Sequence, residues 1–575
     1  MNEKELLKEI IGNFNIEKWN AFFSRKNRKF KKETDFPELI NYGFSSFTNG
    51  LKHGIIPIED DELLISSFKV TKSLTERSGK KEQYELAKKI LKEDLTFLGG
   101  IFIFYDENGN FRFSLITKIY ERTSKGIKQS FTSFKRYTYF VSKELTNKTF
   151  IEQISSADFT SLEKIISAFS VKKVTEEFYK ELSNWYHYSL DKIKFPADLE
   201  EMKNDDKRNA VNLIRLITRI IFIWFLKEKD LIPKVIFDKD FVANILKDFN
   251  KDHNSHYYYN AILQNLFFGT LNRPMNDRKF AKKGDFQVNK NEFDVKNLYR
   301  NSDFLTITEE EFISLFQKVP FLNGGLFECL DKGSIYVDGF SRRENKIAIV
   351  PDYLFFSDEM EVDLKRYGFK QKEIFKGLIN ILQEYNFTVD ENSPVDEEIA
   401  LDPELLGMVF ENLLASYNPE TQETARKSSG SYYTPREIVN YMVDESLIAF
   451  LKNYIDELAE DTIRDIVNYN EKKIPINNDV KNKIVRCIAD LKVLDPACGS
   501  GAFPMGMLHK LVYILQKVDA DNKIWQDIQI EKAILESEKV FADTKDKTER
   551  EEILKQIKKH LMRVSITRTM QESYL

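Results

Sequence analysis

The sequence predicts a chain that combines α/β and mostly helical parts, and three patterns along its 575 residues predict it. Strand and helix patterns alternate over residues 1–148, which predicts an N-terminal α/β domain. Helical periodicity dominates residues 149–400, which predicts a helical connector domain. Residues 401–575 hold a helix, then an apolar strand that runs through a glycine turn into another helix. This order is typical of the start of a Rossmann-like parallel sheet that binds a nucleotide.

The composition indicates a soluble, globular protein, because 42% of the residues are hydrophobic and 31% are charged. The start of the chain, Met1–Glu5, lacks an apolar signal region, and the most apolar stretch, Ile220–Leu226, is far too short to cross a membrane. Three cysteines cannot build a disulfide framework. We therefore expect a cytoplasmic protein with no membrane partner. The net charge of −5 leaves nucleic-acid binding open, since binding patches are local.

Local patterns predict the elements in chain order. Residues Glu62–Val70 form a buried strand, and Gln83–Leu91 form an amphipathic helix. Residues Gly99–Tyr105 and Phe111–Ile116 form a β-hairpin, because the loop between them holds the dipeptide Asn-Gly. In the helical region, Leu213–Leu226 is apolar on nearly all sides, which predicts a core helix.

The strongest motif is the glycine turn. An apolar strand, Leu491–Leu494, ends at Asp495, and a helix follows over about Pro504–Leu515. Glycines allow the backbone to approach a ligand closely, and the helix start presents N–H groups to an anion. The string Asp-Pro-Ala-Cys-Gly-Ser-Gly-Ala-Phe resembles motif I of amino-DNA methyltransferases, which binds S-adenosyl-L-methionine. The resemblance implies a cofactor pocket lined by Asp495, Pro496, Ala497, Cys498, Gly499, Ser500, Gly501 and Phe503.

A second motif lies about 60 residues ahead of the glycine turn. Thr434 suits the N-cap of a helix, Pro435 its first position and Glu437 its third, so the segment could be only a well-made helix start. Its place before the glycine turn resembles motif X of the γ-type N6-adenine methyltransferases. The resemblance implies that Tyr433, Thr434 and Pro435 help to hold the methionine part of the cofactor.

The resemblance extends upstream. Leu213–Pro233, Val319–Phe327 and Pro403–Leu414 resemble the Eco57I-like, type IIG restriction–modification proteins. This implies a site-specific DNA methyltransferase that transfers a methyl group to adenine N6 in double-stranded DNA. The Asn/Asp-Pro-Pro-Tyr/Phe loop that contacts the target base in these enzymes is absent, and the dipeptide Asn418-Pro419 precedes the glycine turn.

No residue can therefore be named as the methyl-transfer catalyst. We expect a truncated chain that is inactive alone and needs a second polypeptide for the rest of the methyltransferase and for target recognition. The apolar period is lost after His560, which suggests a frameshift or a gene split in two. The alternatives are a non-catalytic DNA-binding or scaffold subunit, and a methyltransferase that acts on RNA or protein.

Type IIG proteins often begin with a nuclease domain whose PD-(D/E)xK residues bind Mg²⁺. Asp61 or Glu62 could be the first acid, Lys69 lies on the next plausible strand, and Gln83 begins a helix. The residue two before Lys69 is Ser67, where the pattern needs a carboxylate. A working Mg²⁺-dependent nuclease, a degenerate or DNA-positioning domain, and an unrelated fold all remain open.

A basic run at Arg25–Lys32 carries six positive charges. Such a run could follow the phosphates of DNA, with an affinity that depends on salt. A solvated charged face is the alternative.

Overall fold

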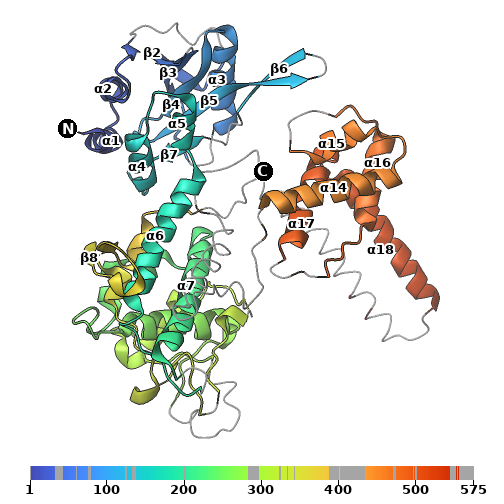
Figure 1. Cartoon of the computed structure of the whole chain (residues 1–575). Helices are drawn as coiled ribbons and strands as arrows, with labels where there is room; N and C mark the ends of the chain where they lie inside the picture. The colour runs from blue at the N-terminus through green and yellow to red at the C-terminus, as the bar shows by residue number, and fades with distance from the viewer. Residues whose placement is uncertain are drawn as a thin grey trace. The chain divides into compact units, whose positions relative to one another are not determined.

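The computed structural model divides the chain into two compact units, Met1–Ser431 and Tyr432–Leu575, which are drawn in Figure 1. The finer boundaries predicted at residues 148 and 400 stay predictions. The structure describes residues 2–32, 43–59, 61–75, 79–123, 126–132, 137–199, 203–282, 297–322, 325–332, 334–341, 343–387, 401, 434, 436–469, 474–496, 498, 501–543, 552 and 555.

A seven-stranded mixed sheet forms the N-terminal part of the first unit. Its order is β1-β2-β3-β4-β5-β6, with β7 also paired to β5. Only β3 and β4 are parallel among these pairs, and α3 (Lys80–Glu93) connects them. The strands are β1 (Lys31–Lys32), β2 (Phe47–Ile58), β3 (Asp61–Val70), β4 (Phe97–Tyr105), β5 (Phe111–Thr123), β6 (Gly126–Phe131) and β7 (Thr138–Val141). The expected strand, helix and hairpin of this region are confirmed.

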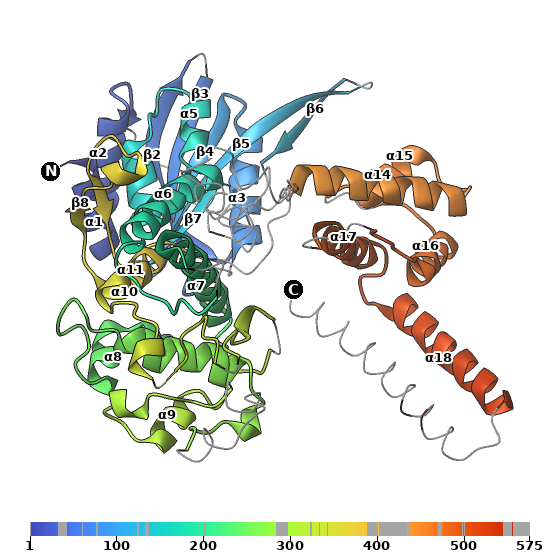
Figure 2. The same ribbon diagram turned by 60° about the horizontal axis from the view of Figure 1, so that its bottom comes forward.

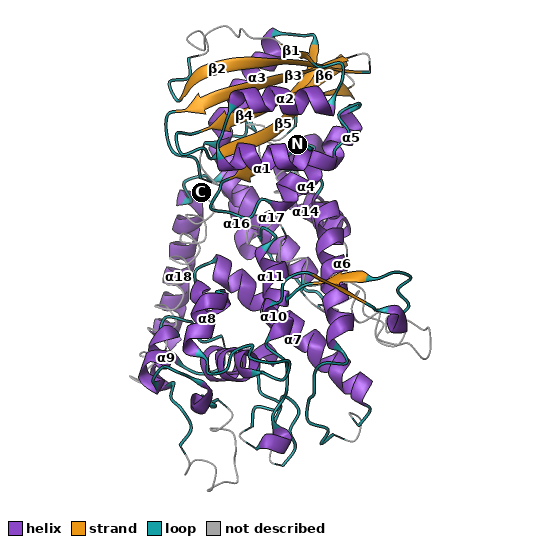
Figure 3. Cartoon of the chain, turned by 90° about the vertical axis from the view of Figure 1, so that its left-hand side faces the viewer, coloured by secondary structure: helices purple, strands orange, loops and turns teal. Residues whose placement is uncertain are grey.

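Helices cover both faces of this sheet (Figure 3). Successive residues of a strand point to opposite faces. Leu63 of β3 thus joins the core beneath α1 (Glu3–Gly12) and α2 (Ile16–Lys26), whereas Leu64 joins the core beneath α3. The first of these cores continues through α4 (Lys148–Ser156) and α5 (Leu162–Ser167) into the helical part of the unit.

The helical part is built around α7 (Asp205–Glu228). Leu213, Ile217 and Trp224 are all buried, which confirms the predicted core helix. By length and composition α7 could cross a membrane, but 78% of its apolar window is buried inside the protein, so core packing explains its hydrophobicity. Around it lie α6 (Val171–Ser189), α8 (Lys239–Ile245), α9 (Glu309–Leu315), α10 (Tyr353–Phe356), α11 (Leu378–Gln383), the π-helical turns at Tyr258–Leu263 and Asn265–Leu271, and the small hairpin of β8 (Met360–Val362) and β9 (Glu373–Phe375).

The second unit is helical in its described residues. It contains α14 (Arg436–Tyr454), α15 (Glu460–Val467), α16 (Asn478–Asp490), α17 (Ala502–Val518) and α18 (Lys523–Asp543), which share one core. The strand predicted at Leu491–Leu494 is wrong, because this segment has no strand partner and the Leu494 side chain is 89% exposed. A strand needs a neighbour for its N–H and C=O groups, and the described part of this unit offers none. The α/β plus helical layout is therefore confirmed for the chain, but the start of a Rossmann-like sheet is not seen.

Candidate cofactor-binding helix pair

The glycine turn leads directly into α17, as the motif predicts. Gly501 has a φ of +86°, in the left-handed region that favours glycine, and it caps the helix. Its N–H donates to the Cys498 carbonyl at 2.7 Å, and its own carbonyl accepts the Met505 N–H at 2.9 Å. Among the described residues, nothing lies within 4 Å of a Cβ built on Gly501, so the turn needs glycine for its backbone conformation.

The helices that follow the two predicted motifs, α14 and α17, cross near their first turns. A Cβ added to Gly506 would lie 2.6 Å from Val439 Cγ1 and 3.6 Å from Val443 Cγ2, so glycine is what allows the two helices to approach. Gly506 is four residues from the start of α17 and Val439 is three residues from the start of α14. At about 1.5 Å per residue, both helix starts lie within roughly 6 Å of the crossing. The helix N-termini that carry the motifs are thus neighbours.

A buried lysine fixes this crossing. The Lys510 side chain is 1% exposed, and its Nζ lies 2.7 Å from Asp444 Oδ1 of α14. The same Nζ donates to the Val467 carbonyl at 3.2 Å and lies 3.5 Å from the centre of the Tyr469 ring. Burial lowers the pKa of Lys510 and raises the pKa of Asp444. The sequence analysis missed Lys510, although a lysine in the apolar stripe of a helix is a signal that could have found it.

The remaining cofactor candidates are only partly described. Thr434 and Asp495 are half-buried, and Pro496 and Cys498 are exposed. Phe503 packs against the core of the second unit. The described part of helix α14 begins at Arg436, and Pro435, the predicted first position, lies outside the described residues. The candidates Tyr433, Pro435, Ala497, Gly499 and Ser500, and the segments Pro403–Leu414 and Asn418-Pro419, lie outside the described residues.

The nuclease candidates do not meet in the N-terminal sheet. The prediction that Lys69 lies on the strand after the first acid is wrong, because Asp61 and Lys69 stand near opposite ends of β3. Eight residues at about 3.3 Å each place them roughly 26 Å apart. Glu62 pairs with Lys31 at 3.5 Å, and Lys69 pairs with a glutamate at 3.1 Å. Gln83 is buried in α3 and accepts a hydrogen bond from an arginine at 2.7 Å.

A neutral hydrogen-bonded chain occupies the position where the nuclease pattern needs a carboxylate. Ser67 Oγ lies 2.8 Å from His53 Nε2, and His53 Nδ1 lies 2.8 Å from Asn20 Oδ1. His53 and Ser67 are fully buried, and burial lowers the pKa of His53 to about 4. The group is therefore uncharged at neutral pH and lacks the anionic oxygen that Mg²⁺ prefers. The sequence analysis noted Ser67 but missed His53.

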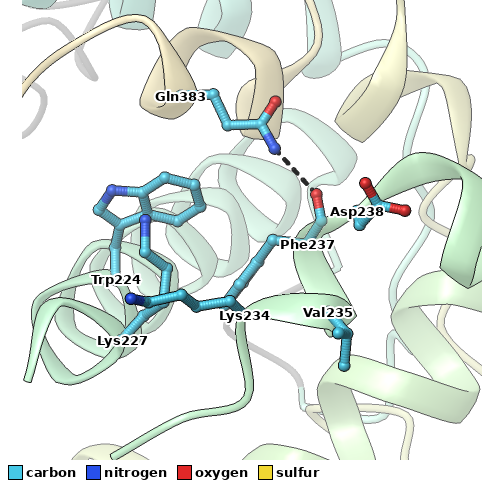
Figure 4. Close-up of a pocket in the computed structure, with 7 residues that line it drawn as sticks. All are labelled: Trp224, Lys227, Lys234, Val235, Phe237, Asp238 and Gln383. Carbon is cyan, nitrogen blue, oxygen red and sulfur yellow. Dashed lines mark hydrogen bonds between the residues drawn. The ribbon is translucent and has the colours of Figure 1, made fainter. Parts of the chain in front are cut away.

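A hollow of about 350 Å³ lies beside the core helix α7 (Figure 4). Lys227 Nζ lies 3.6 Å from the centre of the Trp224 ring, and Gln383 Nε2 donates to the Phe237 carbonyl at 2.9 Å. The two lysines in the lining, Lys227 and Lys234, each pair with an acidic neighbour in the sequence. The hollow therefore offers little net charge to a ligand, and none of the predicted site residues lines it.

A buried acidic cluster in the helical part is structural. Ligand atoms of Cys329, Asp331 and Asp338 lie within 4.8 Å of one another. The Asp331 carboxylate accepts backbone N–H groups from residues 337–340, and Asp338 pairs with Arg219 at 3.0 Å. These carboxylates are already satisfied by the protein, so the cluster anchors the loop that contains it.

The second unit is therefore a helical unit with a glycine turn, and its two motif helices cross near their starts. Similarity to a known protein indicates the class of protein to which the chain is related. In an alignment of 414 residues that covers 68% of the chain, the chain is 27% identical to a Methanocaldococcus jannaschii protein named a "putative type II restriction enzyme and methyltransferase". The chain spans 29% of that relative's length. No family model matches the chain, and no solved structure matches it. The similarity supports a relation to restriction–modification methyltransferases.

Proposed function

We propose that this chain is the cofactor-binding and DNA-holding part of a cytoplasmic, type IIG-like DNA methyltransferase of the Eco57I-like kind. Its methyl donor is S-adenosyl-L-methionine, and its substrate is the N6 amino group of adenine in double-stranded DNA. The crossing of α14 and α17 at Gly506 carries the proposal, because it brings the starts of both motif helices together. The similarity to a restriction enzyme and methyltransferase supports it.

The residues at the helix starts fit such a cofactor. The first N–H groups of a helix have no partner within the helix, and the helix dipole adds positive potential, which suits the carboxylate of the methionine part. Among the described residues, no atom lies within 4 Å of a Cβ built on Gly501 at the left-handed turn. Thr434 supplies a hydroxyl just before α14, and Asp495 supplies a carboxylate just before the glycine turn. We propose that these groups bind and orient the cofactor, which supplies the methyl group.

We propose that the contacts to the target amine come from a second polypeptide, since the sequence has no Asn-Pro-Pro-Tyr/Phe motif. Direct methyl transfer depends on orienting and polarising the target amine. We propose that the chain alone has a site for the methyl donor but no site for the adenine that accepts the methyl group. The purified chain is expected to bind the cofactor and to transfer no methyl group to DNA. Robust methylation by the purified chain would contradict this division of labour.

Cofactor binding is tested by calorimetry of the full chain with S-adenosyl-L-methionine. Gly501→Ala is expected to weaken binding at least tenfold, because alanine rarely adopts a φ of +86°. Gly368→Ala is the matched control, since Gly368 has a φ of +88° and open space around its Cβ but lies in the first unit. The proposal fails if the unchanged chain does not bind the cofactor, or if both variants bind as it does.

The absence of the catalytic motif also favours a second candidate, a non-catalytic DNA-binding or scaffold subunit. This candidate predicts DNA binding without cofactor binding, so the same calorimetry separates the two. For the N-terminal domain we propose a DNA-positioning role in place of cleavage, supported by the neutral His53–Ser67 pair. Incubation of plasmid DNA with the chain and Mg²⁺ is expected to leave the DNA intact.

A further inference from the structure

Helix α14 of the second unit is apolar on two opposite sides. Val439 and Val443 are buried in the core of the unit. Ile438, Tyr441 and Met442 lie on the other side of the helix and are 49%, 67% and 49% exposed. Because Tyr441 and Met442 follow Ile438 by three and four positions, the three residues share one face. A helix that is apolar all round is typical of a buried position, so this exposed face lacks a cover within the part of the chain that the structure describes.

Helix α17 extends this exposed surface. Ile514 and Leu515 are buried in the same core, whereas Met505 and Leu508, three positions apart, are 47% and 49% exposed. The two helices lie against each other and touch at Gly506 (Figure 2). Because both bury one side in the shared core, their exposed apolar sides lie next to each other and away from that core. Exposed apolar surface of this kind marks an interaction site. We name it the apolar face, and its residues are Ile438, Tyr441, Met442, Met505 and Leu508.

The segment ahead of the glycine turn also lacks a neighbour. Leu491–Leu494 has no strand partner among the described residues, and Val493 and Leu494 are 50% and 89% exposed. The glycine turn joins this segment to α17, so the segment and the apolar face belong to one strand-turn-helix pattern. Strands in such patterns pair in parallel sheets whose faces are covered by helices. A neighbour that carries strands would therefore pair the backbone of Leu491–Leu494 and cover the apolar face.

We propose that the apolar face docks a second polypeptide that carries a β-sheet, and that Leu491–Leu494 adds as a strand to the edge of that sheet. Strand addition supplies the segment with partners for its N–H and C=O groups. A second copy of this chain fits less well, because each copy offers one such segment and a two-stranded pair is marginally stable in water.

The similar Methanocaldococcus jannaschii protein supports a partner of this kind. This chain spans 29% of its length, so most of that protein lies outside the shared region. Polypeptide of this extent is enough to form a sheet. The inference rests on the second polypeptide proposed above, but not on cofactor binding.

The test mixes the purified full chain with purified fragments of the Methanocaldococcus jannaschii protein from outside the shared region, and analytical ultracentrifugation detects the complex. One fragment is expected to bind. The double variant Tyr441→Glu/Leu508→Glu should weaken that binding at least tenfold, because it places two charges in the apolar contact. Leu231→Glu/Met275→Glu is the matched control, since these side chains are 40% and 45% exposed but belong to the first unit, and it should bind as the unchanged chain does.

A second pair of variants tests the strand itself. Val493→Pro removes an N–H group that strand pairing needs, whereas Val493→Thr keeps both the N–H group and the β-branched shape. The proline variant should bind the fragment at least tenfold more weakly than the threonine variant. Hydrogen exchange of the complex should show new protection at residues 491–494.

Three results would overturn the inference. They are the absence of binding by every fragment, unchanged binding by the Tyr441→Glu/Leu508→Glu variant, and a dimer of the chain alone that this variant dissociates, since a second copy would then cover the apolar face. Calorimetry with S-adenosyl-L-methionine and methylation assays use the chain without the fragment. Failure of the docking surface is therefore distinguished from failure of the proposed function.

Discussion

Replacing Gly506 with alanine should push α14 and α17 apart at the crossing that brings the two motifs together. The added Cβ would lie 2.6 Å from Val439 Cγ1, closer than carbon atoms tolerate. Val439 is β-branched and 5% exposed, so its side chain cannot rotate away easily. The helices must therefore separate, and the glycine turn ahead of α17 moves with them.

The size of the effect is the difference between two opposing contributions. Overpacking of this kind costs about 1–3 kcal/mol. Alanine in a helix interior gains about 1 kcal/mol over glycine. Gly506→Ala should therefore lower the local free energy of unfolding by up to roughly 2 kcal/mol. Val439→Ala removes two buried methyl groups and costs about 1.6 kcal/mol by itself, but it also removes the clash. The double variant should be more stable than the sum of the single effects predicts.

Hydrogen exchange followed by mass spectrometry tests this prediction, because it measures the protection of peptides from residues 436–454 and 502–518 separately. Gly506→Ala should reduce the protection of both helices and weaken binding of S-adenosyl-L-methionine, and adding Val439→Ala should restore part of both. Gly12→Ala is the control, because a Cβ at the last residue of α1 meets nothing within 4 Å. Unchanged protection in Gly506→Ala, together with strictly additive effects in the double variant, would refute the steric reasoning.

Two buried ionisable groups of the first unit should give pH dependences of opposite sign, and one exposed residue of the second unit should be insensitive to substitution. The pKa of His53 is about 4 against 6.5 when free, so only the unfolded chain takes up a proton between these values. The contribution of His53 to the free energy of unfolding should fall by about 3 kcal/mol as the pH drops from 6.5 to 4. Urea unfolding of His53→Gln should not show this pH-dependent fall. Burial raises the pKa of Asp352 from 3.8 to about 6, so the folded chain takes up this proton first. Its contribution should rise by about 3 kcal/mol as the pH falls from 6 to 3.8, and Asp352→Asn should remove that rise. Leu494→Ser should change stability by less than about 0.5 kcal/mol, because the side chain is 89% exposed. A loss above about 1.5 kcal/mol would show that Leu494 is buried, as a strand would bury it.

Elements whose stability is encoded locally could be predicted from the sequence. The β4–β5 hairpin turns at Gly109, whose φ is +81°, and the Asp106 carboxylate accepts the N–H groups of Asn108 and Asn110. These contacts join residues within five positions of one another, so the short sequence of the loop is enough to predict the turn. The start of α17 at the glycine turn could be predicted for the same reason.

Features that depend on distant partners could not be predicted. The Leu491–Leu494 segment has the apolar pattern of a strand, but a strand forms only against a neighbour, and periodicity does not reveal one. Ser67 lies 14 residues from His53, which lies 33 residues from Asn20. No spacing rule links the three residues. The contact of Gly506 with Val439 joins two helices 67 positions apart and is likewise invisible in either motif.

The buried His53–Ser67 pair helps to decide whether the N-terminal sheet serves DNA cleavage or DNA methylation. Restoring a carboxylate through Ser67→Glu would bury an acid against a neutral imidazole, and burial would raise its pKa and disfavour the charge that Mg²⁺ requires. The acids at the start of β3 stand at the far end of the strand from Lys69, so a single substitution does not assemble a metal site. A sheet that offers a divalent metal no anionic oxygen at this position lacks the centre of a PD-(D/E)xK nuclease, which supports the proposal that it positions DNA while other residues perform the chemistry.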